Sequence, residues 1–185
     1  MTAEQKLLLF AHRDEWRAWL RANHNQVTEA WLILYKKGAH TASLSFEEAQ
    51  AEALCFGWTD VKSKNIDHSR YALRFTPRRA NSVWSMTNIR RVETLIAAGR
   101  MTAAGLAKVT EAQHNGQWEA GIKSEQTDHI PADLEKALHR SKGALDRYKN
   151  LPHSRKKQLL RGLLTAKSGA SRQRRIAAIV QEVSK

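Results

Sequence analysis

The stretch DVKSKNIDHSRYALRFT, residues 60–76, decides the fold class because it reads as two strands joined by a turn. Asp-His-Ser at its centre is typical of a turn and separates two extended segments, Asp60–Ile66 and Arg70–Thr76. Apolar and polar side chains alternate in the second segment, so we expect Phe75 on a buried face and Arg74 on the opposite face. The pattern therefore predicts a β-hairpin in the middle of the chain.

The segments before the hairpin predict one more strand and two helices. The stretch EAWLILYKK, Glu29–Lys37, is apolar on both faces, as in an interior strand. A helix is expected over about residues 4–23, with one face formed by Leu9, Trp16, Trp19 and Leu20. Ser45 and Glu48 have the spacing of a capping box, which predicts a helix from about residue 46 to 56, ended by Gly57.

The segments after the hairpin are expected to be helical. Apolar stripes predict one helix through Ile89, Val92 and Ile96 and another through Leu106 and Val109. The polar segment 119–129 reads as a linker, and every later segment has a helical stripe with basic flanks. We therefore expect an α+β fold with a small, mainly antiparallel sheet of three or four strands and six to eight helices. The expected parts are an α+β core, residues 1–122, and a helical basic segment, residues 130–185, packed on it.

The positive charge is concentrated in the last quarter of the sequence. The net charge is +13, and residues 140–185 hold 13 Lys and Arg against 2 Asp and Glu. Such a surface attracts polyanions, although it does not by itself specify one. One hypothesis is therefore a nucleic-acid-binding module that works through seven basic residues: Arg155, Lys156, Lys157, Arg161, Arg172, Arg174 and Arg175.

The sequence points to a cytoplasmic protein without disulfides. Cys55 is the only cysteine, and its apolar neighbours favour a buried thiol over a nucleophile. The apolar run Leu7–Ala11 is shorter than the hydrophobic region of a signal peptide, and no stretch approaches the roughly 20 residues of a membrane span.

Familiar catalytic and cofactor motifs do not occur. The sequence has no phosphate-binding loop, dinucleotide fingerprint, nucleophile elbow or zinc-protease motif, and its eight histidines are scattered. We expect no metal and no cofactor. An enzyme with Asp60 as its base is a weaker hypothesis, because no second carboxylate has a recognisable spacing to it. The pattern favours a binding protein over an enzyme.

The best candidate for a site is a polar cluster between the hairpin and the next helix. Arginines beside a helix N-terminus can hold an anion. The predicted ligand-binding set is Trp58, Asp60, Arg74, Arg78, Trp84, Ser85 and Asn88. The structural alternative is that Ser82 or Ser85 caps the helix, Trp84 packs, and Arg74 or Arg78 pairs with Asp60. If the set binds a ligand, the expected partner is a small anion or an acidic protein segment.

Several stretches combine rare residues in a fixed order: ALCFGWTD, RFTPRR, VWSMTNIRRVETLIAAGRMTAAG and GQW. Near the end, Ala166-Lys167 precedes Arg172, Arg174, Arg175 and Ile176. Over nearly the whole length, the chain resembles the YdeI/OmpD-associated bacterial family, also called bacteriocin-protection proteins. It departs from that pattern at Thr59 and Ser171.

The resemblance implies a link to resistance against bacteriocins or antimicrobial peptides, and to an outer-membrane porin. It does not imply a reaction. A protein with a charge of +13 repels a cationic peptide over about one Debye length, roughly 8 Å at physiological salt, so electrostatic capture of the peptide is disfavoured. We therefore expect an indirect, accessory role in a stress or resistance response.

Overall fold

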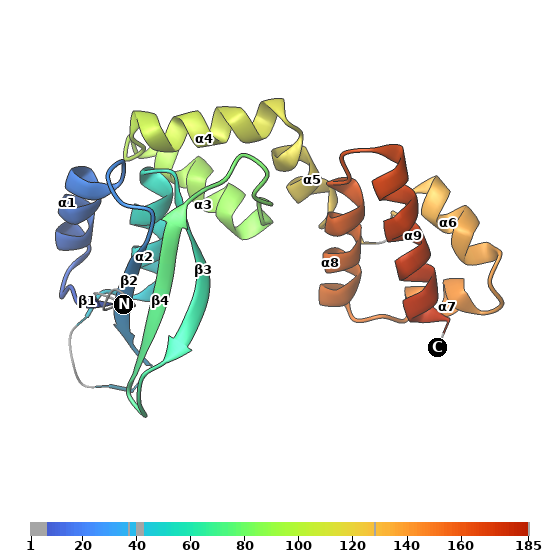
Figure 1. The fold of residues 1–185 in the computed structure, drawn as a ribbon, viewed down its shortest axis with the longest axis horizontal. Coiled ribbons are helices and arrows are strands. Elements are labelled where there is room, and N and C mark those ends of the chain that lie inside the picture. Colours follow the sequence, from blue (N-terminus) through green and yellow to red (C-terminus); the bar gives the residue numbers. More distant parts are fainter. Residues whose placement is uncertain (1–6, 37, 40–42, 128, 185) are drawn as a thin grey trace, which may run out of the picture. The chain divides into compact units, whose positions relative to one another are not determined.

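A computed structural model describes residues 7–36, 38–39, 43–127 and 129–184 (Figure 1). These residues hold one four-stranded sheet and nine helices, which confirms the α+β class. The chain divides into two compact units, one of residues 1–80 and 90–111 and one of residues 81–89 and 112–185. The predicted domain limits stay predictions.

The predicted hairpin is present and forms one edge of the sheet. The strand order is β1-β2-β4-β3, where β1 is Leu7–Leu8, β2 is Ala30–Tyr35, β3 is Trp58–Asn65 and β4 is Arg70–Pro77. β4 pairs antiparallel with both β2 and β3, whereas β1 pairs parallel with β2. The ladder between β3 and β4 has an irregularity between Asp60 and Lys62, where Val61 has no partner. The sheet is thus mainly antiparallel, as expected.

One face of the sheet packs on α1 (Arg13–Asn23) and α2 (Phe46–Cys55). Phe75 is fully buried there, and its ring centroid lies 5.6 Å from that of Trp16. The capping box is confirmed, since Ser45 Oγ accepts from the Glu48 backbone N–H at 3.2 Å. Gly57 ends the segment with a φ of 74°, a left-handed value that a glycine adopts without strain. We call this side the α2 face and the opposite side the Trp31 face.

The N-terminal helix is shorter than predicted. α1 begins after His12, which with Glu15 forms a capping box, while Leu7 and Leu8 pair with β2 as a strand. Leu9 is 53% exposed, so its assignment to the helix stripe is wrong. Apolar spacing alone could not separate a short strand from a helical turn, because the parallel pairing partner lies more than twenty residues away.

Two helices after the hairpin are confirmed, although parts of their predicted stripes are wrong. They are α3 (Met86–Ala97) and α4 (Ala103–His114). Ile96 and Leu106 are 43% and 41% exposed, whereas Leu95 is buried. The segment expected to begin a linker instead forms α5 (Gln117–Lys123), in which Gln117, Ala120 and Gly121 are buried. With α5, the described residues form nine helices, where six to eight were predicted.

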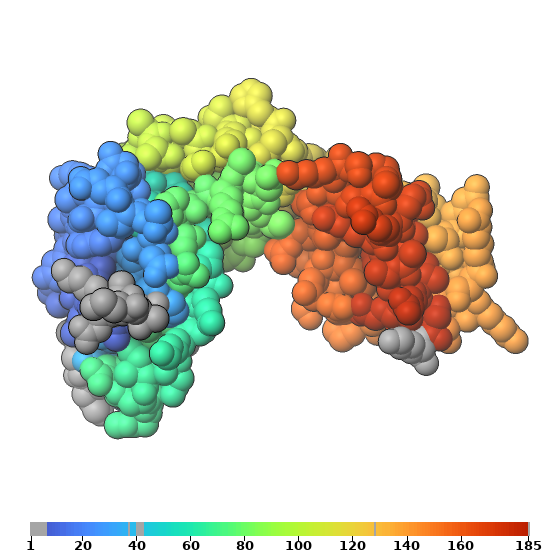
Figure 2. Space-filling view, in the orientation of Figure 1, coloured from blue at the N-terminus to red at the C-terminus, as the bar shows by residue number. Residues whose placement is uncertain are grey.

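The second unit contains a helical core of its own. Its last four helices are α6 (Ala132–His139), α7 (Ala144–Lys149), α8 (His153–Leu164) and α9 (Gly169–Val183). α9 contacts α6, α7 and α8, and Figure 2 shows α9, in red, lying against α8, in orange. The side chains that meet in this core are Leu134, Leu138, Ala144, Tyr148, Leu160, Leu163, Ile176, Ile179 and Val183. The predicted apolar stripes of these helices therefore do form a core.

Candidate ligand site

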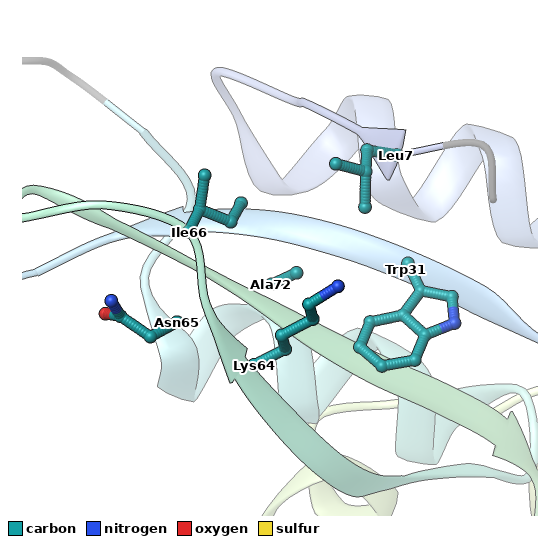
Figure 3. A pocket seen from close by; sticks show the side chains of 6 residues that line it. All are labelled: Leu7, Trp31, Lys64, Asn65, Ile66 and Ala72. Atoms are coloured by element: carbon teal, nitrogen blue, oxygen red, sulfur yellow. The ribbon is translucent and has the colours of Figure 1, made fainter. Parts of the chain in front are cut away.

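A pocket of about 370 Å³ opens on the Trp31 face of the sheet (Figure 3). Side chains from β1, β2, β3, β4 and the turn after β3 meet around it. The lining residues are Leu7, Trp31, Lys64, Asn65, Ile66 and Ala72. The pocket therefore depends on the sheet itself, which holds residues far apart in sequence at fixed positions.

Strand register explains why four of these residues share one face, namely Leu7, Trp31, Lys64 and Ala72. Trp31 is paired with Arg74 on β4 and with Leu7 on β1, and Lys64 is paired with Ala72. Directly paired residues point to the same side of a sheet. Trp31 is 7% exposed and Ala72 is 1% exposed, so they form the floor, whereas Leu7 and Ile66 are partly open to solvent. The result is an apolar floor with an open rim.

Lys64 supplies the positive charge of the pocket. Figure 3 shows its side chain reaching toward Trp31. Within the described part of the chain, Lys64 makes no ion pair. Asn65 is different, because its Oδ1 accepts from Lys36 Nζ at 2.7 Å. An ammonium above an apolar floor suits a ligand that has an apolar body and an anionic group.

Arg74, one of the predicted site residues, acts on this pocket through Glu29. Arg74 donates to Glu29 Oε2 from Nε at 2.8 Å and from Nη2 at 2.5 Å. The other oxygen, Oε1, accepts from Trp31 Nε1 at 3.3 Å. The three side chains form a chain of hydrogen bonds along the Trp31 face, so Arg74 holds the carboxylate that orients the indole.

Asp60 lies on the opposite face, so the pairing of Arg74 with Asp60 that the structural alternative allowed does not form. Asp60 is paired with Phe75 in the ladder and therefore points to the α2 face, where its Oδ1 accepts from Gln50 Nε2 at 2.7 Å. Alternation along β4 sends Arg74 to the other side. Asp60 and Arg74 consequently do not share a site.

Arg78 and Trp58 are buried. Arg78 is 4% exposed and donates from Nη2 to Thr59 Oγ1 at 3.1 Å. Burial lowers the pKa of Arg78 to about 10, and the nearby Asp60 carboxylate opposes this shift, so the guanidinium is protonated at neutral pH. Trp58 is 1% exposed and donates from Nε1 to the His24 carbonyl at 3.1 Å. Both residues contribute to the packing around the hairpin.

The remaining members of the predicted set belong to the second unit. Ser85 caps α3, since its Oγ accepts from the Asn88 backbone N–H at 3.2 Å. Trp84 is 2% exposed and its ring centroid lies 5.1 Å from that of Trp118. Asn88 is 9% exposed. The cap and the packed tryptophan agree with the structural alternative for these two residues, and a ligand role for the whole set stays a prediction.

Sequence reasoning missed a cluster of charges around Glu52, which we call the Glu52 cluster. Glu52 has no exposed side-chain surface and binds Arg13, Arg17 and Arg100, with ion-pair distances of 2.5, 2.6 and 2.7 Å. Burial raises the pKa of Glu52, but the hydrogen bonds from the three arginines outweigh it and hold the pKa below its usual value. The signals available were a glutamate among apolar residues of α2 and two arginines four residues apart on α1.

Five of the seven basic residues proposed for polyanion binding are engaged within the chain. Arg155 pairs with Glu182, Lys157 with Glu125 and Arg172 with Asp133. Two more donate to carbonyl oxygens, namely Lys156 to Lys149 and Arg175 to Gly162. Arg161 is half-buried on α8, and Arg174 is exposed on α9. Binding of a polyanion by this set stays a prediction.

The described residues show three further features. Across them, no three His, Cys, Asp or Glu side chains come together in a group that could hold a metal ion. None of the helices described is both long enough and apolar enough to cross a membrane. Cys55 is buried, in agreement with its expected place in the core, and burial raises the pKa of its thiol.

Comparison with protein families divides the chain near the end of α4. Residues 8–108 match a family described as a domain of unknown function, DUF8412, and residues 129–185 match one described as bacteriocin-protection, YdeI or OmpD-associated. No curated protein and no solved structure gave a match.

The resemblance seen in the sequence is thus confirmed for the C-terminal segment that includes Ala166 and Arg172, whereas the motifs around Gly57 and Arg78 lie in the other match. The first match covers more than half of the chain, so the chain belongs to the DUF8412 family. It also carries a C-terminal domain of the bacteriocin-protection, YdeI/OmpD-associated family.

Proposed function

We propose that the protein is a non-catalytic binding protein whose ligand is a small amphipathic anion, held in the pocket of the Trp31 face. The observation that carries the proposal is the meeting of Lys64 with the buried ring of Trp31 above Ala72. The cavity of about 370 Å³ is within the range of roughly 300–1,000 Å³ for small-molecule sites. A carboxylate with an aromatic or aliphatic body matches both the charge and the lining.

The proposal also includes the role and the location of the protein in the cell. The C-terminal domain belongs to a family named for bacteriocin protection and for association with OmpD. A net charge of +13 argues against direct capture of cationic peptides. We place the protein in the cytoplasm as an accessory of a stress or resistance response, in which the bound anion would act as a signal or a protected metabolite. An acidic protein segment is the alternative partner for the same charge.

The test compares two lysine variants. Decanoate and 2-naphthoate are titrated into the full chain by calorimetry, and each is paired with its uncharged amide. Lys64→Met should weaken binding of the carboxylates about tenfold, as expected for loss of one charged hydrogen bond, and leave binding of the amides unchanged.

Lys62→Met is the matched control, because Lys62 is paired with Arg74 on the same face but does not line the pocket. It should bind both probes like the wild type. Equal weakening by the two variants, or no binding of either carboxylate to the wild type, would overturn the proposal.

A further inference from the structure

The Glu52 cluster brings three guanidinium groups to one carboxylate. Arg13 and Arg17 come from α1, Arg100 follows α3, and Glu52 is on α2. The carboxylate is fully buried, whereas the side chains of Arg13, Arg17 and Arg100 are 35%, 19% and 35% exposed. The positive groups therefore form the outer layer of the cluster, with the negative charge beneath them.

The hydrogen bonds leave donors unused on the outer layer. Glu52 Oε1 accepts from Arg13 Nε and Nη2 and from Arg100 Nη2, while Oε2 accepts from Arg17 Nη1. Arg17 also donates to the Arg100 carbonyl at 2.8 Å. Arg100 Nε is buried and has no hydrogen-bond partner among the described residues. A buried donor without an acceptor is unfavourable, so an acceptor at this point would be favoured.

The cluster holds more positive charge than is needed if it only joins the helices. One arginine neutralises one carboxylate, as in the pair of Arg74 with Glu29, and the Glu52 cluster has two more. Asp14 and Glu48 also raise the pKa of Arg13, and Glu48 in addition accepts hydrogen bonds from Ser45. The three arginines together therefore leave a surplus of positive charge over the Glu52 carboxylate.

We propose that the Glu52 cluster is a binding site for a tetrahedral oxyanion of the phosphate class, either free phosphate or the end of a phosphate monoester. Its oxygens accept from the exposed N–H groups of Arg13 and Arg100, and one oxygen accepts from Arg100 Nε once the Arg100 side chain turns outward. Guanidinium groups match phosphate geometry, and several of them together hold a dianion. The site lies apart from the pocket of the Trp31 face and does not depend on the function proposed for that pocket.

The experiment is a calorimetric titration of the full chain with inorganic phosphate and, separately, phenyl phosphate, at constant ionic strength set with sodium chloride. The wild type should bind with saturation. Arg100→Gln should lose at least tenfold in affinity, and Arg70→Gln should bind like the wild type. Arg70 is the matched control, because its side chain is 38% exposed and forms a one-to-one pair with Asp67.

Glu52→Gln distinguishes a binding site from a cluster that only joins the helices, because the two interpretations predict opposite effects on phosphate binding. If the cluster only joins the helices, this variant is less stable and binds no phosphate. If the cluster is an oxyanion site, removal of the buried negative charge strengthens phosphate binding at least tenfold.

Should Glu52→Gln fail to fold, Arg100→Gln decides alone. A preference for phenyl phosphate over phosphate identifies a monoester as the ligand, and the reverse identifies the free ion. No saturable binding of either probe by the wild type, or equal binding by Arg100→Gln, would overturn the proposal.

Discussion

Asp60 and Arg74 lie on neighbouring strands but point to opposite faces of the sheet. Asp60 accepts from Gln50 on the α2 face, whereas Arg74 pairs with Glu29 on the Trp31 face. Two residues that sequence reasoning placed in one site therefore have separate roles. Asp60 supports the buried charge of Arg78, and Arg74 supports the indole of Trp31.

Asp60→Asn should destabilise the protein more than Arg74→Gln does. The Asn variant leaves Arg78, which is 4% exposed, without its nearby counter-charge, and we expect a loss of about 1–3 kcal/mol. Arg74 and Glu29 are 37% and 39% exposed, so that pair contributes at most about 1 kcal/mol. Urea denaturation of both variants measures the difference. Equal losses would show that Asp60 does not stabilise Arg78.

Arg74→Gln should nevertheless weaken ligand binding in the pocket of the Trp31 face. Without Arg74, Glu29 loses two of its donors and orients the Trp31 indole less well. We expect a several-fold loss of affinity for 2-naphthoate by calorimetry, with little loss of stability. Glu29→Gln should behave in the same way, because it interrupts the same chain of hydrogen bonds. Unchanged affinity in both variants would separate Arg74 from the pocket.

Acid should destabilise the protein in part through Glu52. The pKa of Glu52 is held below its unfolded value of 4.5, so its ionised form contributes stability above pH 4.5. This contribution is lost as the pH falls through the lower folded pKa. Glu52→Gln should therefore show a shallower loss of stability below about pH 4.5 in thermal melts across pH.

Glu47→Gln controls for the change in net charge in that experiment, since Glu47 is an exposed residue of the same helix. If the wild type and Glu52→Gln lose stability in parallel as the pH falls, the ion pairs of Glu52 do not contribute to folding.

Two glycines of the second unit should respond to alanine in opposite directions. A Cβ at Gly121 would lie 2.4 Å from the Trp84 carbonyl oxygen, so Gly121→Ala should cost about 1–3 kcal/mol. A Cβ at Gly162, within α8, would meet no atom within 4 Å beyond its chain neighbours and its own helix backbone, so Gly162→Ala should stabilise by about 0.5–1 kcal/mol. Thermal melts of the two variants measure both effects. A neutral Gly121→Ala would mean that α5 does not pack closely against Trp84.

The features that could be predicted from the sequence are those that neighbouring residues determine. The capping box of Ser45 and Glu48 spans three residues, and the alternation that separates Arg74 from Phe75 needs only one strand. The charge contacts could not be predicted in this way, because Arg74 lies 45 residues from Glu29 and Arg100 lies 48 residues from Glu52.

The helix stripes were partly wrong for a related reason. The spacing of Ile96 and Leu106 permits burial, but whether a neighbouring element covers them depends on the fold. The pocket of the Trp31 face was missed because it needs four strands at once.

The irregularity at Val61 determines where the positive charges of β3 lie. Side chains two residues apart on a regular strand share a face, so Lys62 and Lys64 would follow Asp60 onto the packed side. The extra residue reverses this parity, because Asp60 is paired with Phe75 and Lys62 with Arg74. If Val61 were instead paired with Arg74 in a regular ladder, both lysines would point to the packed side. One inserted residue thus lets a single strand contact the protein interior at one end and present two cations on the Trp31 face at the other.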